Sequence, residues 1–323
     1  MEASHYELKK MLYSKLMTKT FGFSLLAATL LLSVSSQAAE HAASCYSDLR
    51  EQMFADDGVM DVRLVMGYLD AVGSERSDAN QPNKASGRNE EIESYQSELI
   101  KEGFTLVSSK QIQNEMKVPD GQGFVYEKKD VRGRPIRISI VSATKADEKY
   151  NFFASKKAEA FFDSALREAD AVIYSGHSRK GGGPDMRKPV THKDAAGDLH
   201  VDYAHYQKTR PGLARIENNL AKTQDKPELV ASLSCDSYNH FYDFLKKQLQ
   251  CESQSTGLVL STRVAYADET EAAALAIIRS LVSGKDMTAE LGKTKACGAA
   301  GMFGDPTRIP FRFDIVKPAT KSH

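Results

Sequence analysis

The chain has 323 residues, 41% of them hydrophobic and 27% charged, which is the balance of a soluble globular protein. Its 43 basic and 43 acidic residues cancel, so nothing in the charge favours nucleic acid as a partner. The length allows one large domain or two ordinary ones, and no internal repeat divides the sequence.

The N-terminus has the pattern of an export signal. Lys15 and Lys19 precede an apolar stretch over residues 21–34, and the small-residue pattern of a cleavage site follows at residues 35–38. A stretch of this length is short for a membrane span and suits the core of a signal peptide. We therefore expect a signal peptide over residues 1–38 and a secreted or periplasmic mature protein without stable membrane insertion. An uncleaved membrane anchor is the alternative.

Short elements alternate in the first half of the mature chain. An N-terminal helical segment over residues 39–57 is expected to contain one short helix, at residues 45–54. A polar loop over residues 73–89 separates the first strand from a helix that Gly103 terminates. The strands expected here cover residues 62–69, 104–107, 124–127 and 136–141, and the helix covers residues 90–102.

Amphipathic helices and apolar strands also alternate in the second half. Helical spacing of apolar residues predicts one helix around residues 161–169 and another over residues 238–249. Residues 179–224 are polar and rich in Gly, Asp and His, which predicts a long loop with one helix. We expect buried strands at residues 169–176, 228–234 and 257–262, and a helix over residues 272–282 between a capping box of Asp268 and Glu271 and a terminating Gly284. The alternation predicts an α/β domain over residues 58–323, with a mostly parallel sheet and helices on both faces.

Two chemically versatile residues, His177 and Cys235, each follow directly after one of these apolar strands. In open α/β sheets, ligands bind outside the carboxyl ends of the strands. If the two strands are neighbours, the imidazole and the thiol come together at that edge. A thiol needs a nearby base or a lowered pKa to act as a nucleophile, and a histidine supplies both. The pair is therefore predicted to be a nucleophilic cysteine and its acid–base partner.

The order strand–His, long loop, strand–Cys, helix, strand, helix resembles the caspase-like (clan CD) cysteine peptidases, which include caspases, legumains, gingipains and clostripain. The resemblance covers roughly residues 60–290 and is carried by the strings Tyr174-Ser175-Gly176-His177-Ser178 and Leu233-Ser234-Cys235-Asp236-Ser237. It implies a caspase-like sheet and hydrolysis of a peptide or protein substrate, without a cofactor. It also implies that His177 is the general acid or base, that Cys235 is the nucleophile, and that the backbone N–H groups of Ser178 and Cys235 bind the oxyanion.

Three positions differ from the family's usual pattern. Ser178 stands where the family usually has Gly after the His, and residues 236–237 replace the usual Gly shortly after the Cys. Leu233 replaces the Asp that members specific for basic residues often carry two positions before the Cys, so the resemblance does not imply Arg specificity. Around the pair we expect Gly176 and Asp185 to contact substrate, because functional residues concentrate in such loops.

A structural disulfide is the alternative to a nucleophilic Cys235. Four cysteines follow the predicted signal peptide, namely Cys45, Cys235, Cys251 and Cys297. Export permits disulfides, and any pairing of all four cysteines consumes Cys235. The chain would then be an inactive caspase-like binding protein. Oligomeric state, substrate preference and any need for proteolytic activation stay open.

A metal-dependent secreted hydrolase is the other alternative. His200, Asp202 and His205 lie close together in the sequence, and with His192 or Asp185 they have the side chains that hold Zn²⁺. Their spacing does not match the helical HExxH pattern. We therefore expect a solvated loop here and no metal.

Overall fold

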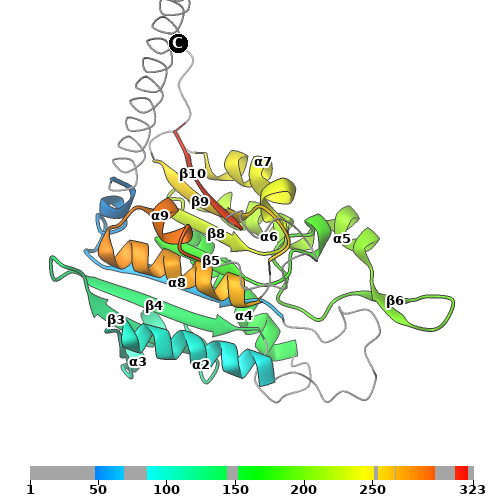
Figure 1. Cartoon of the computed structure of the whole chain (residues 1–323), viewed down its shortest axis with the longest axis horizontal. Helices are drawn as coiled ribbons and strands as arrows, with labels where there is room; N and C mark the ends of the chain where they lie inside the picture. Colours follow the sequence, from blue (N-terminus) through cyan, green and yellow to red (C-terminus); the bar gives the residue numbers. More distant parts are fainter. Residues whose placement is uncertain are drawn as a thin grey trace, which may run out of the picture. The chain divides into compact units, whose positions relative to one another are not determined.

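The computed structural model describes residues 48–68, 86–143, 152–250, 254–265, 267–294 and 310–318 (Figure 1). These residues belong to one compact unit, Asp48–His323. Within the described residues, no helix combines the length and the apolar character that crossing a membrane requires. The predicted signal peptide over residues 1–38 and most of the predicted loop over residues 73–89 lie outside the described residues.

A single large sheet forms the centre of this unit. Its strands are β1 Met60–Met66, β2 Thr105–Leu106, β3 Gly123–Lys129, β4 Pro135–Ser142, β5 Ala171–Ser175, β8 Leu229–Leu233, β9 Thr256–Ser261 and β10 Phe311–Val316. In the described part of the chain they follow the order β10-β9-β8-β5-β1-β4-β3-β2. Strands β9, β8, β5, β1 and β4 pair in parallel, whereas β10 and β3 pair antiparallel at the two sides. The predicted α/β fold with a mostly parallel sheet is confirmed.

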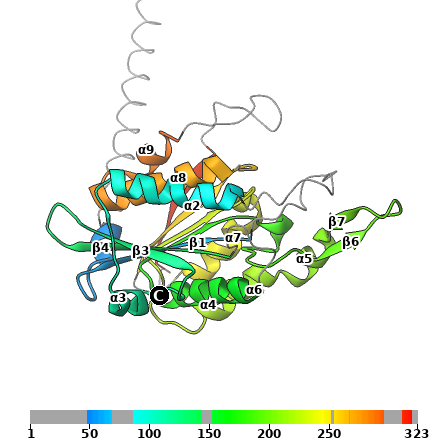
Figure 2. The same ribbon diagram turned by 90° about the horizontal axis from the view of Figure 1, so that it is seen from below.

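Helices cover both faces of the sheet (Figure 2). They are α2 Ser86–Lys101, α3 Lys110–Glu115, α4 Phe152–Glu168, α6 Pro211–Leu220, α7 Ser237–Leu249, α8 Ala267–Ser283 and α9 Met287–Leu291. The apolar sides of α4, α6 and α7 form one buried cluster on the first face, and α8 packs with α2 and α9 on the other. Because both faces are covered, every residue of β5, β8 and β9 is buried, which explains their continuous apolar runs.

The segment after β5 contains more structure than the predicted loop with one helix. A hairpin of β6 Thr191–Lys193 and β7 Leu199–Val201 projects from the body of the molecule (Figure 2). Two helices follow it, α5 Tyr203–Thr209 and α6. Asp202 caps α5 by accepting a hydrogen bond from the backbone N–H of His205, and Pro211 stands in the first turn of α6.

Two helices make contacts that the sequence did not indicate. The helix at residues 48–52 packs into the same unit, because Leu49 and Met53 are buried and the Arg50 guanidinium donates to the carbonyl of Leu281. The predicted segment over residues 39–57 is described only from residue 48 onward. Helix α8 begins at Ala267, before the predicted cap, and the Glu271 carboxylate accepts a hydrogen bond from Ser94 of α2.

Candidate active site

The strands that carry His177 and Cys235 are immediate neighbours. Strands β5 and β8 pair in parallel, and their last residues, Ser175 and Leu233, stand opposite each other. The backbone N–H of Gly176 continues the ladder by donating to the carbonyl of Leu233 at 3.3 Å. His177 and Cys235 each lie two residues beyond these paired ends, so both loops leave the sheet at the same edge. This is the neighbourhood that the sequence predicted.

A direct hydrogen bond joins the two loops. The Ser178 hydroxyl donates to the backbone carbonyl of Cys235 at 2.7 Å, and Ser178 is only 3% exposed. The residue after the histidine therefore touches the cysteine itself. A glycine at this position, as the family usually has, would lack this bond. We call the Ser178–Cys235 hydrogen bond the loop clamp.

The thiol of Cys235 is partly exposed and free. It forms no disulfide, and its sulfur lies 3.7 Å from the carbonyl oxygen of Ala265, a distance that suits a weak S–H donor. The three other cysteines of the sequence lie outside the described residues. The structural disulfide that was the alternative for Cys235 is not formed in this structure.

Buried hydroxyl groups hold the cysteine loop from below. Ser237 donates to the carbonyl of Ser232 at 2.7 Å and accepts from the backbone N–H of Ser261 at 2.8 Å. The Ser261 hydroxyl donates to the carbonyl of Ser234 at 2.6 Å. All four serines are almost completely buried, so these bonds are protected from water. They fix the backbone on both sides of Cys235.

Left-handed backbone conformations cluster at these two strand ends. Asp236, directly after the cysteine, has φ 51°, and Arg179 and Lys180, shortly after the histidine, have φ 46°. Non-glycine residues in this region cost about 1–3 kcal/mol each and persist where the surroundings impose them, often at functional sites. The turn at Asp236 leads directly into α7, a helix of 13 residues. The positive end of its dipole therefore lies next to Cys235.

Among the described residues, no hydrogen bond is formed by the backbone N–H of Ser178 or of Cys235. Uncommitted N–H groups held on a fixed backbone are the donors that stabilise a developing oxyanion. These are the two donors that the family resemblance implies.

The histidine loop is anchored to the core through Tyr174. The buried Tyr174 hydroxyl lies 2.9 Å from the carbonyl of His177 and 3.0 Å from that of Asp185, and it accepts from the Asp185 N–H at 2.9 Å. Gly176 packs against the same hydroxyl. A Cβ at Gly176 would lie 2.6 Å from the Tyr174 oxygen, which explains the glycine by close packing.

Asp185 is a structural centre of the same loop. Its carboxylate accepts from Arg179 Nε at 3.0 Å, from the Tyr206 hydroxyl at 3.2 Å and from the Arg187 N–H at 3.0 Å. Burial, followed by the nearby Asp185 charge, raises the pKa of Tyr206 to about 12. With these three partners, Asp185 shapes the loop. Contact with substrate stays a prediction for Asp185 and Gly176. The contacts that the two residues make within the protein do not support it.

The alternative metal site is not assembled. Asp202 caps α5, and the ring of His205 packs edge-on against Tyr206. His200 lies on β7 and binds the carboxylate of Asp194 at 2.9 Å. Within the described residues, no three His, Cys, Asp or Glu side chains gather in a way that could hold a metal ion. The set His200, Asp202 and His205 was therefore a wrong alternative.

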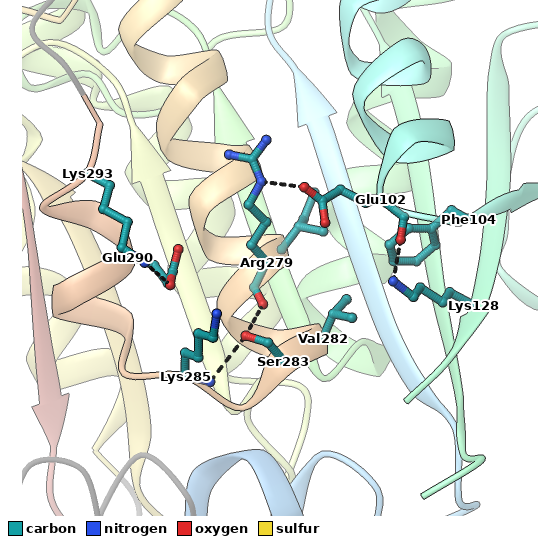
Figure 3. Close-up of a pocket in the computed structure, with 10 residues that line it drawn as sticks. Glu102, Phe104, Lys128, Arg279, Val282, Ser283, Lys285, Glu290 and Lys293 are labelled. Atoms are coloured by element: carbon teal, nitrogen blue, oxygen red, sulfur yellow. Dashed lines mark hydrogen bonds and ion pairs between the residues drawn. The ribbon is translucent and has the colours of Figure 1, made fainter. Parts of the chain in front are cut away.

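A cavity of about 290 Å³ lies beside the last turns of α8, next to residues of α9 and β3 (Figure 3). Helix α8 begins near Cys235 and ends at this cavity, and its 17 residues span about 25 Å. The charged groups on the wall are largely paired: Arg279 binds Glu102 at 2.8 Å, and Lys293 binds Glu290. The cavity is lined by Glu102, Phe104, Lys128, Ile278, Arg279, Val282, Ser283, Lys285, Glu290 and Lys293. Of the lining residues, Ser283 uses its hydroxyl to donate to the carbonyl of Arg279 and to accept from the backbone N–H of Lys285.

No protein-family model matches the chain, and a search of the curated proteins finds no match. The site is therefore interpreted from its geometry. The sequence predicted that the loops of His177 and Cys235 lie close together, but it did not indicate the supporting hydroxyl groups. The recurrence of Ser232, Ser234 and Ser237 around the cysteine was the signal that could have indicated them.

Proposed function

We propose that this chain is an exported cysteine peptidase that hydrolyses peptide bonds, with Cys235 as nucleophile and His177 as general acid and base. The observation that carries the proposal is the loop clamp between Ser178 and Cys235, at the ends of two paired parallel strands. It brings a free thiol and a histidine loop together at the edge where α/β folds bind ligands.

The reaction follows from these positions. His177 takes the proton of the Cys235 thiol, and the thiolate sulfur forms a bond to the carbonyl carbon of the substrate. The oxyanion accepts hydrogen bonds from the N–H groups of Ser178 and Cys235. His177 then gives its proton to the leaving amine, the C–N bond breaks, and an acyl-enzyme remains. A water molecule, deprotonated by His177, releases the acid and restores the thiol.

The surroundings hold the nucleophile in a fixed place beside the start of α7. Helix α7 begins two residues after Cys235, so the positive end of its dipole lies beside the cysteine. The serine bonds beneath the loop keep this arrangement fixed, so little reorganisation is required during the reaction. Export itself is proposed on the sequence pattern of residues 1–38.

The test uses single variants of the full chain against a mixed peptide library. We expect Cys235→Ala to abolish cleavage and His177→Ala to lower it by about 10²–10⁴-fold, the usual contribution of a general acid–base. His240→Ala is the matched control, because His240 is an exposed histidine on the neighbouring α7. Full activity in both test variants would refute the proposal.

Thiol labelling separates a peptidase from an inactive binding protein. We expect iodoacetamide to alkylate Cys235 in the folded chain at a rate that depends on pH and on His177, and a peptide aldehyde to protect it. A Cys235 that labels no faster than a free thiol, with no effect of His177→Ala, would favour the inactive binding protein. Activity lost to a chelator and not to thiol reagents would favour a metal-dependent hydrolase.

A further inference from the structure

We propose that the β6–β7 hairpin binds a divalent transition-metal ion, such as Zn²⁺ or Ni²⁺, through the imidazoles of His192 and His200. The proposal is independent of the peptidase function. It also differs from the rejected alternative, since neither Asp202 nor His205 takes part.

The two histidines stand directly opposite each other. They form a cross-strand pair in the antiparallel ladder, so their side chains lie on the same face of the hairpin. The ring centroids are 5.9 Å apart, and the ring planes differ by 33°. Both residues are exposed, on a hairpin that projects from the body of the molecule (Figure 2).

Asp194 orients the His200 ring. The Asp194 carboxylate lies 2.9 Å from His200 Nε2, so in the neutral ring this nitrogen carries the proton and Nδ1 keeps its lone pair. The same carboxylate accepts from the N–H groups of Ala196 and Asp198, each at 2.9 Å, and is therefore fixed by the turn. A carboxylate on the far nitrogen is the usual second partner of a metal-binding histidine.

The distances suit one shared ion. Zn–N bonds are about 2.0–2.1 Å, which places two nitrogen ligands of one tetrahedral ion about 3.3 Å apart. The ring centroids are 5.9 Å apart, and rotation of the exposed His192 ring about its side-chain bonds can bring one of its nitrogens to this separation from Nδ1 of His200. Imidazole nitrogen suits Zn²⁺ and Ni²⁺, and water fills the remaining positions.

The experiment is a calorimetric titration of the full chain with ZnCl₂, after carbamidomethylation of its thiols. Blocking the thiols removes the competing site that Cys235 and His177 would form. We expect His192→Ala and His200→Ala each to bind one Zn²⁺ equivalent fewer than the parent. His205→Ala, a nearby histidine outside the pair, is the matched control and is expected to bind as the parent does. Asp194→Asn keeps an oxygen for the turn, and we expect it to weaken binding by about 10-fold or more.

A second measurement guards against unfolding of the hairpin. In ¹H–¹⁵N spectra of the imidazole groups, Zn²⁺ should shift the nitrogen signals of His192 and His200 together and leave that of His205 in place. The backbone amide spectrum of each variant, recorded without metal, reports whether the hairpin is intact. Equal stoichiometry in parent, His192→Ala and His200→Ala proteins, or a shift at only one of the two rings, would overturn the proposal.

Discussion

Replacing Asp170 by Asn is expected to stabilise the protein at neutral and alkaline pH. Asp170 precedes β5, and its carboxylate accepts from the backbone N–H of Asp61 at 2.6 Å. Burial is the main cause that raises the pKa of Asp170 to about 8, and the charges of Glu228 and Asp61 add to it. In the unfolded chain the pKa of an aspartate is about 3.9.

The sign follows from the protons that each state holds. Below pH ~4 both states are protonated, so the group contributes no pH dependence. Between pH ~4 and 8 the folded state keeps the proton while the unfolded state loses it. Stability therefore falls by about 1.4 kcal/mol per pH unit, which accumulates to about 6 kcal/mol at most. Asn is neutral at every pH and keeps an oxygen to accept from Asp61, so the variant lacks this loss.

The assay is urea unfolding of the parent and of Asp170→Asn at intervals from pH 4 to pH 9. We expect similar stability near pH 4 and a difference in favour of the variant that grows up to pH 8. Asp198→Asn is the matched control, since Asp198 is an exposed aspartate on the hairpin. A difference between parent and Asp170→Asn that stays constant across this range would refute the reasoning.

Three further substitutions test the site. Ser178→Ala removes the loop clamp and leaves the Cys235 carbonyl without this donor. We expect a loss of about 1–3 kcal/mol in the free energy of unfolding and a lower kcat at similar KM. An unchanged kcat would show that the clamp does not position the site. Gly176→Ala forces a methyl group to within 2.6 Å of the Tyr174 oxygen. We expect urea unfolding to show a loss of about 1–3 kcal/mol in the free energy of unfolding, and we expect slower alkylation of Cys235. Values like those of the parent would contradict the packing argument. Asp185→Ala removes the carboxylate that pairs with the buried Arg179, and we expect a loss of about 3–5 kcal/mol in the free energy of unfolding. A raised KM with parent stability would instead support the predicted substrate contact.

Much of the central fold could be predicted from the sequence, because it depends on local patterns of apolar residues. Strands β5 and β8 are continuous apolar runs, and buried parallel strands have this composition. Helix α4 keeps its apolar residues on one face, which is what the helical spacing predicted. Since polar groups at carboxyl strand ends meet at one edge, the approach of the His177 and Cys235 loops was also predictable.

Most of the missed features depend on contacts between distant parts of the chain. Strand β10 lies at the edge of the sheet beside β9 and was missed, although its residues alternate between apolar and charged side chains, as in a half-buried strand. Asp185 looked like a rim carboxylate, but Arg179 and Tyr206 enclose it, and no local pattern indicates these partners. In the same way, the role of the Ser178 hydroxyl depends on the Cys235 carbonyl, which lies 57 positions further along the chain.

The groups at the two ends of β5 and β8 respond to a rise in pH with opposite consequences: reactivity increases at one end, and stability decreases at the other. Asp170 and Glu228 directly precede these strands, and burial is the main cause that raises their pKa to about 8 and about 7. His177 and Cys235 follow the same strands, about 17 Å away along five residues. A rising pH increases the thiolate fraction of a cysteine. At the other end of the strands it also puts charges on Asp170 and Glu228, which are buried and therefore more stable in the neutral form. We therefore expect the alkaline limit of Cys235 alkylation in the folded chain to be set by unfolding, and Asp170→Asn to move that limit upward. If the variant loses its folded-state alkylation at the same pH as the parent, the carboxylate end does not set the working range of the site.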